Sequence, residues 1–442
     1  MEKETPRLGG RGAIRQVFGI RNYRYFLLGQ FVSSSGNWVQ RVAMAWLAWE
    51  LTESPAWLGI IAFADMFPTF AVGLIAGAVI DRSDSLKVLR LTQLLSILQA
   101  TVLAAVVFSG IVAIEWLVSL ALVRGVIIAF NRPARLTTIY YLTGGTFLSS
   151  AIAVNAMIFN SSRFLGPALA GLIIAGWGVG WAFVFNAVSF IAFYVALMAI
   201  RIQPAPMRER QKSGLAADAM AGLRYALSAA GIAFLLVVIV LDSLFVRPFI
   251  ELLAGFAADV FGRGASAYSM LLTLHGIGAM AGSYWLARRG GIVGYTRIIV
   301  TTLLVLAVAL LTFALAQNYW VALAMMPVTG AAFVIQGIAI QTLLQTAVAP
   351  EMRGRVMGLY GIVSRGTPAA GALVMGAASA VLGLPAPVAG GAILCLVLWL
   401  WARSRQTAMT RLLEPAPAPT DHRYKKIIRN PSESHKTSTD GY

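Results

Sequence analysis

Long apolar stretches separated by shorter polar connections run along most of the chain. Most of these stretches are close to the roughly 20 residues that a helix needs to cross a bilayer. Inside lipid, backbone groups must be satisfied within the protein, which favours helices. We predict twelve membrane-spanning helices, at 25–50, 57–80, 88–110, 115–134, 150–175, 179–200, 230–256, 266–287, 296–316, 319–345, 355–380 and 386–402. The pattern therefore predicts an all-α membrane protein with twelve transmembrane helices.

Basic residues concentrate on alternate connections between these helices. Most of the 35 Lys and Arg residues lie in the N-terminal arm, the even-numbered connections and the C-terminal tail. The fourth connection carries Arg132 and Arg135, whereas Arg263 is the one basic residue of the odd-numbered connections. Positive charge is retained on the cytoplasmic side during membrane insertion. We therefore expect a multi-pass protein of the inner (plasma) membrane with both termini in the cytoplasm.

The composition agrees with this interpretation and limits the classes of partner that we expect. Hydrophobic residues make up 58% of the chain and charged residues 12%, whereas charged residues make up about 25% of a soluble domain. The net charge of +17 could suggest nucleic acid, but the basic residues flank apolar segments on one side. We interpret them as a topology signal with affinity for membrane lipids, and we expect no nucleic-acid partner. We also expect no cleavable signal peptide, because the first 24 residues are basic and polar.

A long, polar and basic connection divides the chain into two sets of six predicted helices. We expect a cytoplasmic arm at 1–24, a six-helix bundle at 25–200, a cytoplasmic linker at 201–229, a second six-helix bundle at 230–403 and a disordered cytoplasmic tail at 404–442. The tail is rich in polar residues and cannot bury enough apolar surface to fold alone.

The two sets of helices repeat several small-residue motifs. The Gly-xxx-Gly motif at 73–77 recurs at 278–282, and the Gly-Pro pair at 166–167 is echoed by Thr-Pro at 367–368. Two repeated units place a binding site near the middle of the bilayer, between the halves, and permit rocking between two access states. The sequence has no Gly-Lys-Ser/Thr nucleotide loop. This organisation predicts a secondary transporter that is not an enzyme and uses no cofactor.

The start of the second connection, residues 77–82, reads Gly-Ala-Val-Ile-Asp-Arg. It resembles the loop motif of the major facilitator superfamily, Gly-x-Leu-Ala-Asp-Arg-x-Gly-Arg-Arg, although Asp, Ser and Leu at 84–86 depart from it. The resemblance implies a major facilitator fold in which Gly77, Asp81 and Arg82 form a cytoplasmic gating latch.

Other segments resemble one branch of that superfamily. Residues 163–171, Arg-Phe-Leu-Gly-Pro-Ala-Leu-Ala-Gly, resemble the helix-five motif of exporters, which implies roles for Gly166, Pro167 and Gly171. Segments 36–43, 131–135 and 247–253 look like the enterobactin-exporter-like, or transmembrane secretion effector, proteins. The resemblance covers about residues 15–403. It implies export, and because the branch lies near lysophospholipid transporters, a lipid substrate stays open.

Several charged side chains lie at membrane depth in the predicted helices. An unpaired charge there costs at least roughly 2.5–3.5 kcal/mol. We expect these side chains to face the cavity between helices or to pair with one another. Together with Asn37, which adds hydrogen-bonding capacity, they are the candidate residues for substrate binding or coupling. They are Arg41, Asp65, Arg124, Arg163, Asp242, Arg247, Glu251 and Arg365.

Three of the arginines are candidate anion ligands. A guanidinium stays charged and presents a planar fork that suits carboxylate, phosphate or catecholate oxygens. Arg124 and Arg163 would supply it from the first half and Arg365 from the second; Arg124 also resembles the helix-four arginine of the superfamily. The alternative is a buried arginine bonded to helix carbonyls or to a fixed acid.

The acids are candidates for proton coupling. Burial and a nearby arginine act in opposite directions on a carboxyl group, so Asp242 or Asp65 could bind and release a proton during a cycle. Otherwise each is a permanent partner of an arginine. Arg247 and Glu251 are four residues apart, which predicts a local ion pair on one helix face or a direct role in transport. His275 is either a neutral hydrogen-bonded residue or a group that titrates near neutral pH.

The sequence as a whole favours a proton-coupled secondary exporter of a small amphipathic or anionic molecule, siderophore or drug-like. A lysophospholipid transporter is the first alternative, and a non-transporting membrane scaffold or sensor is the second. The expected partners are the small-molecule substrate, protons and membrane lipids, and we expect a monomer. Charges kept inside the membrane argue against the scaffold.

Overall fold

The computed structural model describes residues 17–143, 147–200 and 215–414, in which Asp81 and Arg365 are described by their backbone alone. The described part is helical. The first group of helices comprises α2 (Arg21–Thr52), α3 (Pro55–Ala71), α4 (Gly73–Asp81), α5 (Ser85–Phe108), α6 (Ile114–Thr143), α7 (Leu148–Trp177) and α8 (Val179–Ala199). The second comprises α9 (Leu215–Ser228), α10 (Ala230–Phe245), η1 (Arg247–Leu252), α11 (Leu253–Gly255), η2 (Phe256–Val260), α12 (Ala265–Arg289), α13 (Tyr295–Leu315), α14 (Tyr319–Ala347), α15 (Pro350–Leu382) and α16 (Pro385–Leu413).

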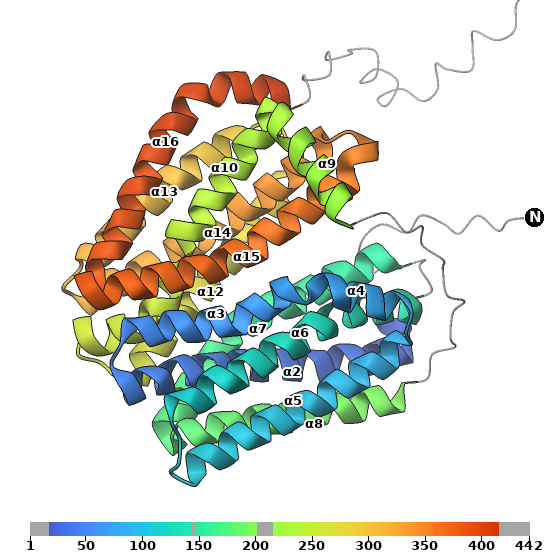
Figure 1. Ribbon diagram of the computed structural model, residues 1–442, viewed down its shortest axis with the longest axis vertical. Coiled ribbons are helices and arrows are strands. Elements are labelled where there is room, and N and C mark those ends of the chain that lie inside the picture. Colours follow the sequence, from blue (N-terminus) through green and yellow to red (C-terminus); the bar gives the residue numbers. More distant parts are fainter. Residues whose placement is uncertain (1–16, 144–146, 201–214, 415–442) are drawn as a thin grey trace, which may run out of the picture.

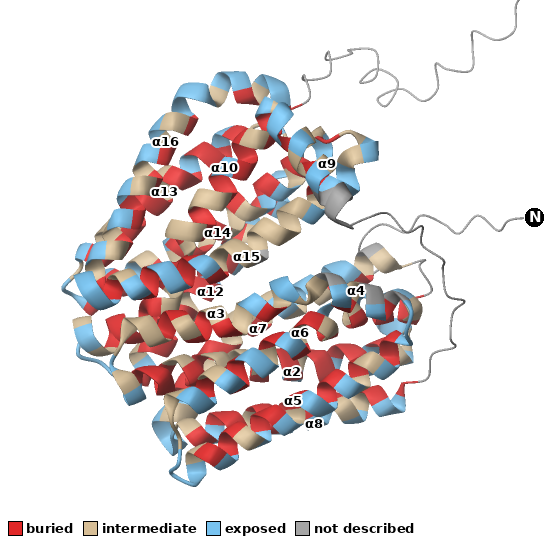
Figure 2. Ribbon diagram, viewed as in Figure 1, coloured by how far each residue is buried: buried red, intermediate tan, exposed pale blue. Residues whose placement is uncertain are grey.

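The helices form two groups that lie side by side (Figure 1). α2 to α8 make one group and α9 to α16 make the other. The groups meet where α3 packs on α15 and α7 packs on α12. Figure 2 shows buried residues along the inner sides of the helices and exposed residues along the outer side of α16. Each group therefore has its own packed interior.

Eight helices are long and apolar enough to cross a membrane: α5, α6, α7, α8, the stretch Ala230–Val260, α13, α14 and α16. The other predicted spans are helical as well, as α2, α3 with α4, α12 and α15. α3, α12 and α15 lie at the contact between the groups, and α2 packs on α7 and α8 inside the first group. α3 is apolar but is only 17 residues long. α2, α12 and α15 carry more polar and small residues, as expected of helices that face other helices rather than lipid.

Two predicted helices are interrupted. The predicted helix at 57–80 is α3 and α4, which are separated at Val72, four residues after Pro68. Proline lacks the N–H that an inner helical position donates, so it weakens the helix there. The predicted helix at 230–256 ends as an α-helix at Phe245 and continues as the 3₁₀ turn η1, whose second residue is Pro248.

Two of the predicted boundaries shift. The linker predicted at 201–229 contains α9, from Leu215 to Ser228. The tail predicted from 404 begins as helix, because α16 continues to Leu413. The carboxylate of Glu414 then accepts hydrogen bonds from the backbone N–H groups of Gly294 and Thr296 at the start of α13. This contact gives the end of α16 a fixed position on the second group.

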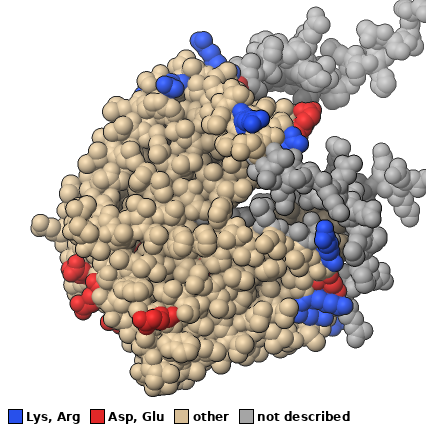
Figure 3. Space-filling model, viewed as in Figure 1, with Lys and Arg blue, Asp and Glu red and all other residues tan. Residues whose placement is uncertain are grey.

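The two groups approach each other closely at one end of the molecule. A Cβ on Gly59 of α3 would lie 2.4 Å from the carbonyl oxygen of Ala372 in α15, and one on Gly171 of α7 would lie 2.7 Å from the Cβ of Ser269 in α12. At the other end of the same α3–α15 layer, Gly73, Gly77, Gly354 and Gly358 would meet nothing within 4 Å. The groups therefore touch at one end and diverge at the other, where Figure 3 shows a notch between them.

Charge is distributed unevenly between these ends. On the face in Figure 3, Lys and Arg gather at the notched end, and most of the visible Asp and Glu lie at the closed end.

Candidate functional site

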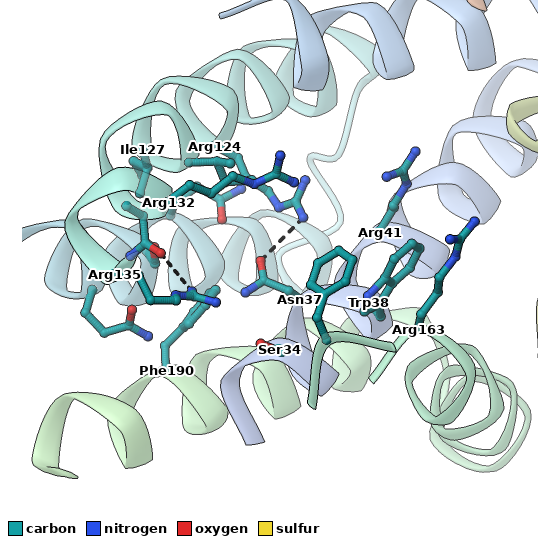
Figure 4. Close-up of a pocket in the computed structure, with 16 residues that line it drawn as sticks. Ser34, Asn37, Trp38, Arg41, Arg124, Ile127, Arg132, Arg135, Arg163 and Phe190 are labelled. Carbon is teal, nitrogen blue, oxygen red and sulfur yellow. Dashed lines mark hydrogen bonds between the residues drawn. The ribbon is translucent and has the colours of Figure 1, made fainter. Parts of the chain in front are cut away.

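A cavity of about 230 Å³ lies inside the first group, between α2, α5, α6, α7 and α8. Its lining contains five arginines and no Asp or Glu. In Figure 4, Arg124, Arg132 and Arg135 lie on one side of this space, and Arg41 and Arg163 lie on the other, beside Trp38. Trp38, Phe159, Phe190 and two isoleucines supply apolar surface beside them. The arginines are Arg41, Arg124, Arg132, Arg135 and Arg163. This lining suits a molecule with both anionic and apolar parts.

Arg124 joins three helices at one side of the cavity. Its Nη1 forms an ion pair with the Asp65 carboxylate of α3, and its Nη2 donates to Asn37 Oδ1 of α2 at 3.4 Å. The Nε of Arg124 is buried and has no hydrogen-bond partner among the described residues. Asp65 therefore balances the charge of Arg124, and the remaining donor is left for another group.

Arg163 of α7 reaches from the cavity to the second group. Its Nη2 lies 3.5 Å from His275 Nε2 of α12, and His275 Nδ1 lies 3.2 Å from the Thr329 hydroxyl of α14. Within the described ranges no carboxylate lies within ion-pair distance of Arg163. The positive charge of Arg163 is thus not balanced by a neighbouring acid.

Arg132 and Arg135 were not among the sequence candidates, because they were counted with the fourth connection, at the end of the helix predicted at 115–134. α6 continues past them to Thr143, and both residues line the cavity. Arg135 Nη2 donates to Asn131 Oδ1 at 2.8 Å, and Asn131 Nδ2 donates to the Thr92 hydroxyl of α5 at 2.9 Å. The Nε of Arg135 is buried without a hydrogen-bond partner in the described part of the chain. The signal that could have found them is the segment 131–135 of the family resemblance.

A smaller pocket of about 170 Å³ lies between the two groups and shares Trp38, Arg41 and Arg163 with the first cavity. Its wall carries an ion pair between Arg41 of α2 and Glu251 of η1, with Nη2 and Oε1 2.5 Å apart. This pair connects the two groups directly.

The local pair predicted between Arg247 and Glu251 is not formed. Arg247 Nε instead lies 2.6 Å from Asp242 Oδ2, and Glu251 pairs with Arg41. The reason is that 247–252 is a 3₁₀ helix with three residues per turn, so residues four apart no longer share a face. Asp242 is 1% exposed, and its second carboxylate oxygen is buried with no hydrogen-bond partner among the described residues.

The remaining sequence candidates have other positions. Gly166 and Gly171 are contact points: a Cβ on Gly166 would lie 2.2 Å from Trp38 Cβ, which holds α7 against α2. Pro167 lies inside α7. Gly77 and Arg82 lie at the end of α4, away from close contacts. The side chains of Asp81 and Arg365 lie outside the described residues, so the latch and the third arginine stay predictions.

Buried amides fix the helices around the cavity. Gln40 of α2 donates to Gln99 of α5 at 3.1 Å and accepts from Asn186 of α8 at 2.5 Å. Gln99 in turn donates to the backbone carbonyl of Leu120 in α6 at 3.2 Å. Because buried polar groups cost free energy when they lose a partner, this network holds α2, α5, α6 and α8 in a set arrangement. Among the described residues no cluster of His, Cys, Asp or Glu could hold a metal ion.

Known proteins resemble this chain over most of its length. The model of the family described as "Transmembrane secretion effector" matches residues 17–422. The multidrug efflux pump Tap of Mycolicibacterium fortuitum is 26% identical over 373 residues, which are 81% of this chain and 90% of that protein. The staphyloferrin A transporter of Staphylococcus aureus is 27% identical over 176 residues, which are 40% of this chain and 44% of that protein, so the match spans less than half of that relative.

The fold is that of major facilitator transporters. A crystal structure of a bacterial homologue of the human lysosomal transporter Spinster, inward-facing and unoccupied, superposes with a TM-score of 0.64. The two share 16% sequence identity, and the superposition covers 90% of this chain and 99% of the other. With the family match over 17–422, this chain belongs to the transmembrane secretion effector family and is a multi-pass membrane transporter of the major facilitator superfamily.

Proposed function

We propose that this transporter exports a small amphipathic molecule with anionic groups, siderophore or drug-like, in exchange for protons. The observation that carries the proposal is the cavity of the first group, which has five arginines and no acid in its lining. Two relatives are named as a staphyloferrin A transporter and a multidrug efflux pump, and these names fall in the same two substrate classes.

The charge balance of the cavity supports an anionic substrate. Arg41 and Arg124 have carboxylate partners in Glu251 and Asp65. Arg163 and Arg135 have neutral partners, His275 and Asn131. Two positive charges without an opposing acid in one cavity attract an anion and repel a cation. The amides of Gln93, Gln99 and Asn131 on the same wall favour a compact polar ligand over a long acyl chain, so we place the lysophospholipid second.

We propose twelve membrane crossings in two repeated six-helix units, 25–200 and 230–403, in the inner membrane with both termini in the cytoplasm. The gathering of Lys and Arg at the notched end supports this orientation, which makes the arrangement inward-facing. Cysteine labelling from outside intact cells should reach Gly264→Cys and not Lys212→Cys, in a Cys395→Ser background. Labelling at 212 would overturn the orientation.

Alternating access requires the contact between the groups to change. We propose that the Arg41–Glu251 ion pair separates when the closed end opens. At the notched end, Gly73 and Gly77 of α4 and Gly354 and Gly358 of α15 leave open space, so the two helices can approach there when the cavity closes on the cytoplasmic side. Asp81 and Arg82 would then act as the latch. One polypeptide supplies both groups, so a monomer suffices.

We propose Asp242 as the proton site. Protonating Asp65 would free Arg124 for an anion, so proton and anion would bind together there, which is the linkage of cotransport rather than exchange. Asp242 is separate from the arginine cavity and has a buried oxygen without a partner that can accept a proton. Its partner Arg247 lines the pocket between the groups, so protonation changes the ion pairs where the groups meet.

Proteoliposomes with an acidic lumen test the proposed function. An amphipathic aromatic carboxylate offered from outside should accumulate, a protonophore should abolish the accumulation, and the matching neutral amide should not accumulate. Equal accumulation of the amide would refute the anion preference, and insensitivity to the protonophore would refute proton exchange. A protein that moves no probe in any condition would support the scaffold interpretation.

A further inference from the structure

The second group of helices carries a long apolar groove on its outer surface, away from the transport cavity. α14 packs against α12 on one side and against α13 on the other. The groove between α12 and α13 has a volume of about 750 Å³. Its floor consists of small residues such as Gly278, Ala331 and Ala332, and Trp285 and Ile335 stand at its sides. Its lining follows a stretch of nine residues of α13, from Arg297 to Val305, which is about 12 Å of helix.

The groove does not lead to the transport cavity. At its floor α12 and α14 are in backbone contact: a Cβ on Gly278 would lie 2.0 Å from the carbonyl oxygen of Pro327, and one on Gly330 would lie 1.9 Å from that of His275. Backbones this close leave no passage for a ligand. An occupant of the groove is therefore in contact with the membrane and not with the transported substrate.

Two arginines stand at one end of the groove and contrast with its apolar walls. Arg289 is the last residue of α12, and Arg297 lies in the first turn of α13. Both are exposed, and neither forms an ion pair within the described part of the chain. Arg289 Nη2 donates to the carbonyl of Val293 at 3.0 Å, which holds the side chain over the α12–α13 turn. A second groove, between α13 and α16, also ends on Arg297 and adds Arg403.

The carboxylate of Glu414 lies at this end of the groove, next to Gly294, and already has hydrogen-bond partners. The Glu414 carboxylate accepts from the N–H groups of Gly294 and Thr296, so the helix N-terminus does not offer those donors to a ligand. An anion at this end would therefore be bound by the arginine side chains.

We propose that this groove binds an anionic phospholipid from the membrane. The phosphate lies between Arg289 and Arg297, and an acyl chain lies along the α12–α13 groove beside Trp285. Charge complementarity selects the headgroup, because a guanidinium binds phosphate with a planar pair of donors. The apolar floor then selects a lipid over free phosphate. Trp285, one helical turn before Arg289, lies where a tryptophan favours the boundary between headgroup and chain.

The test uses the full chain, purified in a neutral detergent and titrated with phosphatidylglycerol or phosphatidylcholine of identical chains, with binding read by native mass spectrometry. The wild type should bind phosphatidylglycerol more tightly than phosphatidylcholine. Arg289→Gln with Arg297→Gln should weaken phosphatidylglycerol about thirtyfold, since each basic residue near a lipid surface contributes about 1 kcal/mol. The matched control is Arg288→Gln, whose side chain lies over Tyr284 instead of the groove and should leave binding unchanged.

A second variant tests the contribution of the acyl chain of the lipid separately from that of its headgroup. Ala281 is exposed and lines the groove, so Ala281→Phe fills it while both arginines stay in place. Phosphatidylglycerol binding should fall in this variant, and glycerol 1-phosphate should not compete in the wild type. Unchanged binding in Ala281→Phe, displacement by glycerol 1-phosphate, or equal binding of the two lipids would each overturn the proposal. Because one variant removes charge and the other adds bulk, a folding defect in either leaves the other as the test.

Discussion

The two groups of helices fill their interiors in different ways. Inside α2 to α8 lies a cavity with five arginines, linked to a network of buried amides. In the second group Phe249 stacks on Phe333 with ring centroids 6.1 Å apart and meets Phe313 edge-on at 5.7 Å, and all three rings are buried. Two charged residues of that group, Arg247 and Asp242, are paired with each other. We therefore propose that the first group recognises the charge of the substrate and that the second group moves against it as a packed body.

Loss of charge at Asp242 of the second group and at Asp65 of the first group should have different effects on transport. The effect at Asp242 is the largest that we expect. Asp242→Asn keeps a side chain of the same shape but cannot gain or lose a charge, so we expect it to abolish accumulation driven by a pH gradient while substrate counterflow continues. Asp65→Asn should keep gradient-driven transport and bind anions more tightly, because Arg124 loses its competing carboxylate. Transport assays in proteoliposomes with both variants decide between the two sites. Normal coupling in Asp242→Asn would remove that residue from the account.

Truncation of a phenylalanine should destabilise the protein more in the second group than in the first. Phe249→Ala should cost about 3–5 kcal/mol, the usual cost of emptying a packed aromatic site. Phe159 faces the cavity of the first group and is 43% exposed, so Phe159→Ala should change stability by about 0.5 kcal/mol or less. Unfolding of both purified variants by a denaturing detergent measures the loss of stability in each. Similar losses would mean that the first interior is as tightly packed as the second.

The order of the helices and the bias of basic charge could be predicted from the sequence because they depend on local composition. The partners of the intramembrane charges could not. Arg41 and Glu251 are 210 residues apart, and their pairing depends on how two groups of helices meet. The predicted Arg247–Glu251 pair was wrong because the spacing rule assumed an α-helix where Pro248 favours a 3₁₀ turn.

The arginine cavity itself was only partly predictable. Arg124 and Arg163 were expected because they interrupt apolar segments, and the structure brings both to one cavity. Arg132 and Arg135 were assigned to a connection because hydropathy falls there, yet α6 continues for eight residues beyond Arg135, to Thr143. Hydropathy marks the limit of lipid contact, whereas a helix next to a polar cavity can stay regular beyond that limit.

The next largest effect is expected at the ion pair between Arg41 and Glu251, which connects the two groups of helices. Glu251→Gln removes the charge that holds Arg41, and a charge-assisted hydrogen bond contributes about 1.5–3 kcal/mol. The population of molecules that are open at the closed end of this structure should rise roughly ten- to hundredfold. Spin labels at Ser83→Cys, just after α4, and Glu351→Cys on α15, in Cys395→Ser, report the distance across the notch, which should shorten. Glu50→Gln is the control, because Glu50 bonds within α2 to Trp46; an equal shift in that variant would contradict a specific role for Glu251.

The central claim is that the first group recognises the charge of the substrate through Arg135 and Arg163. The most direct measurement is calorimetric titration with one aromatic scaffold that carries no carboxylate, one or two. In the wild type each added carboxylate should tighten binding, and Arg135→Ala or Arg163→Ala should weaken the charged ligands roughly ten- to hundredfold, since each lost bond to a charged group is about 1.5–3 kcal/mol. The neutral member should bind the variants and the wild type alike, and Arg→Lys should restore the loss only in part. Equal losses for the neutral and charged members would mean that these arginines hold the helices together, and would contradict the account.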